Sequence, residues 1–126
     1  MALEITWEPY GVYRRFYGAM TRDDLARSVS EVHTSAKFDK LYYSINDLSG
    51  VTDILIDAEV VEDAAVQAMG ASLSNKRLIM AFVANNEKAL ALARTFSNPT
   101  YQSFPAQYFA TLNEARAFVS EHVPKA

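Results

Sequence analysis

The chain of 126 residues has the size of a single domain, and its composition is 50% hydrophobic with only four glycines and four prolines. We therefore expect one domain over residues 1–126, with a packed core and no extensive disorder. The formal charge of -3 argues against a nucleic-acid partner, which requires a basic surface. The absence of cysteine excludes disulfides, thiolate nucleophiles and cysteine metal sites, and it fits a reducing compartment.

No segment has the pattern of a signal peptide or of a membrane span. The N-terminus lacks a basic and an apolar region, and the longest apolar run, Leu78 to Ala84, is far shorter than the ~20 residues that cross a bilayer. We expect a cytoplasmic protein. The nearest approach to a basic cluster is a group of four arginines: Arg14, Arg15, Arg22 and Arg27. Because Asp23 and Asp24 dilute this group, we interpret it as a solvated face.

The N-terminal third predicts a hairpin followed by a helix. Hydrophobic and polar residues alternate from Leu3 to Trp7 and again from Val12 to Gly18, the period of half-exposed strands. Between them, Glu8 to Gly11 places Pro and Gly at the positions that suit a type I turn. Thr21 is a typical N-cap with acidic residues in the following turn, and the helical pattern continues to about Ala36.

The middle of the chain predicts two more strands and a helix between them. Leu41 to Asp47 has the composition of a strand that ends in a polar loop, and a helix begins around Asp57. Leu78 to Ala84 is apolar on both faces, as in a central strand covered by helices on each side.

The C-terminal third predicts a helix, a short strand and a last helix. Asn85 or Asn86 caps the first of these helices, which ends at Asn98-Pro99. Gln107 to Ala110 follows as a strand, and Thr111 with Glu three residues later forms a capping box. The predicted fold class is α/β: an N-terminal β-hairpin, then alternating β/α units that form a mixed, mostly parallel five-stranded sheet with four helices.

The polar segment after the third strand is the main candidate for a functional site, because ligands of such sheets gather at the carboxyl ends of the strands. It carries Asp47, Ser49, Thr52, Asp53 and Asp57. These side chains either satisfy the loop's own backbone, or dock a protein partner, or present Ser49 or Thr52 for phosphorylation. The spacing of the three aspartates matches neither a calcium loop nor a carboxylate-histidine site, so we predict no metal. We also predict no cofactor.

No catalytic arrangement is recognisable, and we predict that the protein is not an enzyme. His33 and His122 each fall near the C-terminal end of a predicted helix, where an imidazole interacts favourably with the helix dipole. The sequence has no nucleophile elbow, phosphate-binding glycine loop or dinucleotide fingerprint. On the hairpin, Trp7, Tyr13 and Tyr17 either pack structurally or form a dimer face or the wall of an apolar pocket.

The order of elements, together with the stretch from Leu41 to Asp53, resembles the STAS domain of anti-sigma-factor antagonists. In particular it is similar to small stand-alone bacterial STAS-like (SpoIIAA-like) proteins of unassigned function. The CRAL-TRIO (SEC14-like) lipid-binding domains are related to them in fold. The resemblance implies a non-enzymatic protein-interaction or regulatory module, with a homodimer as one form. The alternative that it implies is a binder of a small apolar or lipid-like ligand in a SEC14-like pocket.

In regulatory STAS domains a partner kinase phosphorylates a serine or threonine at the start of a helix. The residues that stand there in this chain are Asp57, Ala58 and Glu59. Asp57 matches the pattern, but Ala58 replaces the phosphorylated residue, so the phospho-switch does not carry over. Glu59 either imitates a permanently modified state or is an ordinary first-turn acidic residue.

Overall fold

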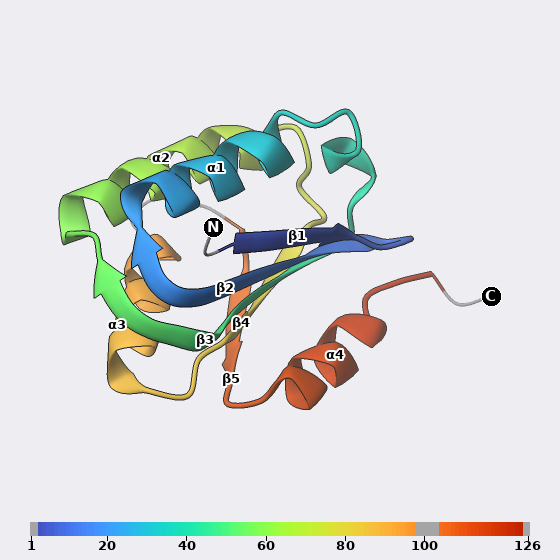
Figure 1. Ribbon diagram of the computed structural model, residues 1–126. Helices are drawn as coiled ribbons and strands as arrows, with labels where there is room; N and C mark the ends of the chain where they lie inside the picture. The colour runs from blue at the N-terminus through green and yellow to red at the C-terminus, as the bar shows by residue number, and fades with distance from the viewer. Residues whose placement is uncertain (1–2, 98–103, 125–126) are drawn as a thin grey trace.

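The computed structural model describes residues 3–97 and 104–124, which form a five-stranded sheet with the strands in chain order (Figure 1). The strands are β1 (Leu3–Trp7), β2 (Gly11–Thr21), β3 (Tyr43–Leu55), β4 (Ile79–Val83) and β5 (Ala106–Phe109). β1 and β2 form an antiparallel hairpin, and each later strand is parallel to the one before it. The predicted hairpin-led, mostly parallel sheet is confirmed.

Three helices cover one face of the sheet and a fourth covers the other (Figure 1). The helices are α1 (Arg22–His33), α2 (Ala58–Ser72), α3 (Glu87–Phe96) and α4 (Leu112–Ser120), with a short 3-10 helix η1 (Phe38–Lys40) after α1. α1, α2 and α3 each connect two neighbouring parallel strands and lie on the same side of the sheet, the arrangement expected of right-handed crossovers. α4 follows the last strand and is free to pack on the opposite face.

The predicted helix starts are confirmed at the level of hydrogen bonds. The caps are Thr21, Asp57, Asn86 and Thr111, and each side chain accepts a hydrogen bond from the backbone N–H three residues further on. The end of α1 was predicted too far along the chain, at Ala36. The helix ends at His33, because the chain turns there and places Phe38 of η1 in the core. The predicted end of α3 at residues 98 and 99 lies outside the described residues.

β3 is the main departure from the sequence prediction. The polar run after Asp47 was expected to be a loop, but it continues as strand to Leu55 and pairs with the end of β2. Two register shifts interrupt this pairing, and Gly18 at one of them has a φ of 65°, a backbone conformation that favours glycine. Pairing with the long β2 therefore overrides the local turn-forming composition.

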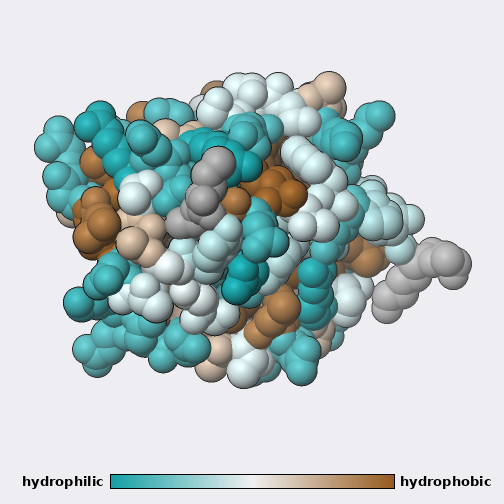
Figure 2. All heavy atoms as spheres, viewed as in Figure 1, coloured by the Kyte–Doolittle hydropathy of each residue, from teal (hydrophilic) through white to brown (hydrophobic). Residues whose placement is uncertain are grey.

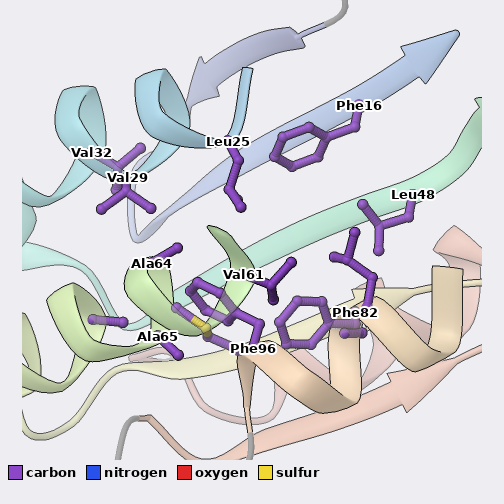
Figure 3. Packing of buried hydrophobic residues seen from close by; sticks show 14 of the residues in the cluster. Phe16, Leu25, Val29, Val32, Leu48, Val61, Ala64, Ala65, Phe82 and Phe96 are labelled. Carbon is purple, nitrogen blue, oxygen red and sulfur yellow. The ribbon is translucent and has the colours of Figure 1, made fainter. Parts of the chain in front are cut away.

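The sheet separates two hydrophobic cores of unequal size. Met80 and Phe82 of β4 point into the larger core beneath α1, α2 and α3, part of which is seen in Figure 3. Ala81 and Val83 of the same strand point into the smaller core beneath α4. The prediction of a central strand buried on both faces is confirmed.

Candidate functional site

Asp47 lies inside the sheet and not in a loop, with a side chain that is almost fully buried. Its Oδ2 accepts a hydrogen bond from the Tyr13 hydroxyl at 2.5 Å. Its Oδ1 accepts from the Ser49 backbone N–H at 2.9 Å and from the Ser49 hydroxyl at 2.6 Å. Burial is the main cause that raises the pKa of Tyr13 far above its usual value, and the hydrogen bond to the Asp47 carboxylate is the second cause. Asp47 thus joins β2 to β3, and nothing in this arrangement leaves its carboxylate open to a partner.

A second polar cluster lies on the same face of the sheet, beside α4. Arg116 donates to both carboxylate oxygens of Glu8, at 2.6 and 2.7 Å, and the Tyr43 hydroxyl donates to the same carboxylate. The hydrogen bond from Arg116 lowers the pKa of Glu8, while burial and the Glu8 carboxylate raise the pKa of Tyr43 to about 12. The Arg116 guanidinium also lies 5.2 Å from the centroid of the Tyr13 ring. Both tyrosines therefore stay protonated, and the cluster attaches α4 to the hairpin.

Most of the other predicted residues border a surface groove between the end of β3, α2 and α3. The groove consists of two adjoining hollows of about 370 and 340 Å³, and Ile54 and Lys88 line both. Four of the predicted site residues line it: Thr52, Asp53, Asp57 and Ala58. We refer to this feature as the β3 groove. The remaining three predicted residues, Asp47, Ser49 and Glu59, do not line it.

The β3 groove runs along an unpaired part of the strand. β4 pairs with β3 only from Tyr43 to Asp47, so in the described part of the chain no strand pairs with that edge of β3 from Leu48 to Leu55. Leu55 is 64% exposed. Figure 2 shows hydrophobic atoms gathered at the left of the view, over the end of β3 and the start of α2.

The groove carries more carboxylates than basic groups, together with several apolar side chains. Three carboxylates and one ammonium group line it: Asp53, Asp57, Glu87 and Lys88. Apolar side chains between them include Ile54, Ile56 and Leu92. The carboxylate of Asp57 also accepts the Val60 N–H at 3.0 Å as the cap of α2, so this residue has a local role as well. The groove as a whole is apolar with an acidic border.

The three aromatic residues singled out on the hairpin do not form one surface. Trp7 pairs with Val12 in the β1–β2 register, packs against the larger core and lies beneath the Lys37 ammonium group. Tyr13 and Tyr17 lie on the opposite face, where Tyr13 packs against the smaller core and the Arg15 guanidinium covers Tyr17. Trp7 lies opposite Val12 and points to the same face, whereas Tyr13, the next residue of β2, points to the other face. The predicted grouping of Trp7 with Tyr13 and Tyr17 is therefore wrong. A homodimer through Tyr13 and Tyr17 stays a prediction.

Two further sequence interpretations are wrong. Arg14 does not belong to a solvated basic face, since its side chain is only 2% exposed and donates to Ser28 and Ser44. His33 is not a protonated partner of the helix dipole, because burial lowers its pKa to about 3, with the positive charge of Arg14 as a second cause. Its ring packs against Phe38, 5.1 Å away between centroids.

The described residues contain no group of three or more His, Cys, Asp or Glu side chains placed to hold a metal ion. Of the helices they form, none has both the length and the hydrophobicity needed to cross a membrane.

Comparison with known proteins supports the fold and leaves the activity open. No protein-family profile matches the sequence, and no curated protein matches it. Among solved structures, the chain is similar to an uncharacterized protein of the DUF3478 family, with a SpoIIAA-like fold, from Shewanella loihica PV-4. The similarity covers 94% of this chain and 92% of that one, with a TM-score of 0.52 and 15% sequence identity. The protein therefore has a SpoIIAA-like α/β fold, as the sequence predicted.

Proposed function

We propose that the protein is a non-enzymatic interaction module that receives an extended segment of a protein partner in the β3 groove. The observation that carries this proposal is the length of β3, which continues to Leu55 although its last pair with β4 is Asp47 with Val83. An unpaired strand edge offers a row of backbone N–H and C=O groups, and partner peptides commonly add to such an edge as a further strand.

The side chains of the groove define what the partner segment should contain. The apolar surface of Ile54, Ile56 and Leu92 favours an apolar anchor residue. The surplus of carboxylates, with Asp53 and Glu87 beside β3, favours lysine or arginine next to that anchor. The proposed partner is therefore an extended, apolar segment with basic flanks.

Regulation at the start of α2 would differ from that of the phosphorylated STAS domains. Ala58 has no hydroxyl to modify, and Glu59 is an exposed residue in the first turn of the helix. We propose that binding at the groove is constitutive and does not depend on a phosphate at this position.

Selection from a random peptide library, followed by affinity measurement, tests the proposal. We expect the selected peptides to combine an apolar residue with Lys or Arg, and to shift the amide resonances of Thr52, Asp53 and Ile54. The double variant Asp53→Lys, Glu87→Lys should weaken their binding about tenfold or more, because it reverses the charge of the groove. Glu121→Lys makes the same kind of change at an exposed position on the far side of the sheet and should leave the affinity unchanged.

If the library yields no specific peptide, or if the peptides bind the double variant as tightly as the unaltered protein, the proposed groove function is wrong.

A further inference from the structure

A small cavity lined by buried residues lies between the sheet, α1 and α3, and Leu92 of α3 borders both this cavity and the β3 groove. The volume of the cavity is about 20 Å³. Most of its wall is apolar, and Figure 3 shows side chains that converge on it from four elements: Phe16 from β2, Leu25 from α1, Leu48 from β3 and Phe82 from β4. The polar residues of the wall are Arg14, Ser28 and Asn46.

Arg14 brings an uncompensated positive charge to this cavity. Its Nη1 donates to the Ser28 carbonyl at 3.3 Å and to the Ser28 hydroxyl at 3.2 Å, and its Nη2 donates to the Ser44 hydroxyl at 2.8 Å. These partners are all neutral, and Nε has no partner among the described residues. Burial lowers the pKa of Arg14 to about 10, so the guanidinium remains charged at neutral pH. A buried cation without a counter-charge is costly for a protein to keep.

The hydrogen-bond chain next to Arg14 fixes what Asn46 presents. The Ser44 hydroxyl accepts from Arg14, so its own proton is donated onward, to Asn46 Oδ1 at 3.2 Å. The amide nitrogen of Asn46 is left without a partner in the described structure, and the residue is only 4% exposed. Arg14 Nε and Asn46 Nδ2 are therefore buried N–H donors without an acceptor, and both residues line the cavity. Unpaired N–H donors next to a positive charge favour an anionic ligand.

We propose that this cavity is the head-group site for a carboxylate that carries an apolar chain. The carboxylate replaces the missing counter-charge of Arg14 and accepts from Asn46, while the chain lies against the apolar wall. At its present size the cavity holds about one water-sized group, so the chain must follow another path. Leu25 and Val29 separate the cavity from a hollow of about 150 Å³ between α1 and α2, and rotation of these two side chains would open that path.

Titration with decanoate, decanol and acetate tests both halves of the ligand. We expect calorimetry to detect binding of decanoate, and we expect decanoate to raise the melting temperature of the protein. Decanol lacks the charge and acetate lacks the chain, so each should bind at least about tenfold more weakly. Arg14→Met keeps a side chain of similar reach in an apolar setting and should reduce decanoate affinity about tenfold or more without unfolding the protein. The groove variant Asp53→Lys should bind decanoate normally, which separates this site from the proposed partner site.

Asn46→Asp is a second test that does not depend on removing the arginine. The new carboxylate supplies Arg14 with an internal counter-charge, so this variant should melt at a higher temperature without ligand and should no longer bind decanoate. Equal binding of decanol and decanoate, or unchanged decanoate binding by both Arg14→Met and Asn46→Asp, would overturn the proposal. Absence of decanoate binding to the unaltered protein would overturn it as well.

Discussion

At the scale of single residues, the contact between Gly11 and Tyr43 shows how closely the hairpin and β3 approach. A β-carbon at position 11 would lie 2.3 Å from Cε1 of the Tyr43 ring, which no packed structure tolerates. Gly11→Ala should therefore displace Tyr43 from Glu8 and lower the free energy of unfolding by about 1–3 kcal/mol, measured by urea denaturation.

Gly70 provides the matched control for this substitution. It lies in α2 with no atom within 4 Å of a β-carbon at its position, so Gly70→Ala should stabilise the protein by about 0.5–1 kcal/mol. Equal stability of the Gly11→Ala variant and the unaltered protein would contradict the close contact.

His33 makes the stability of the protein dependent on pH. Its pKa is about 3 in the folded state against 6.5 for the free side chain, so below pH 6.5 the unfolded chain takes up a proton that the folded chain does not. The contribution of His33 is thus present above pH 6.5 and is lost as the pH falls toward 3, by up to about 1.4 kcal/mol per pH unit. Urea denaturation between about pH 7 and about pH 4 should show a shallower decline for His33→Leu.

The interpretation fails if His33→Leu declines as steeply as the unaltered protein. The positive charge of the Arg14 guanidinium also disfavours protonation of His33.

At the scale of elements, the attachment of α4 depends on the pair of Arg116 and Glu8, which are 108 residues apart. Arg116→Met removes both hydrogen bonds to the Glu8 carboxylate, and because Arg116 is partly exposed we expect a loss of only about 1 kcal/mol. Hydrogen exchange should become faster in α4 and remain unchanged in α2.

Arg15→Met is the appropriate comparison for Arg116→Met. Arg15 pairs with Glu4 of the neighbouring strand at an exposed position of the hairpin. If the two variants have the same effect on exchange in α4, the pair of Arg116 and Glu8 does not hold that helix.

The element types and helix caps could be predicted from local signals, but the length of β3 could not. Asp47, Ser49, Gly50 and Asp53 all favour turns when read alone. Their strand conformation depends on pairing with the last residues of β2, a long-range contact that local composition does not encode. The strand edge that we assign to partner binding was therefore predicted as a loop.

The same limit applies to the individual site residues. Asp57 could be predicted as a cap from its position before an apolar run, whereas the burial of Asp47 depends on Tyr13 of another strand. Arg14 was missed although a signal was present: Val12 and Phe16, which share its strand face, are both apolar. The alternation of residues along the strand indicated that the Arg14 side chain points into the core. Because Arg15 follows it directly, the two arginines were interpreted as part of a solvated basic cluster.

At the scale of the whole molecule, the two cores should contribute unequally to stability. Phe82 is almost fully buried in the larger core, where it lies near Phe96 and Tyr108, while Phe118 of α4 is only partly buried against the smaller core. Phe82→Ala should cost about 3–5 kcal/mol in urea denaturation, and Phe118→Ala clearly less. Equal losses of stability in the two variants would contradict an unequal contribution of the two cores.

The strands of the sheet follow one another in space in the same order as along the chain. During synthesis each strand can therefore join the edge of a sheet that already exists, and no strand has to be inserted between two earlier ones. The edge to which strands are added moves outward with every addition, and the last strand added is β5, which spans only Ala106–Phe109. An edge of that length gives a neighbouring molecule little to pair with, so pairing with another chain is disfavoured at this end of the sheet.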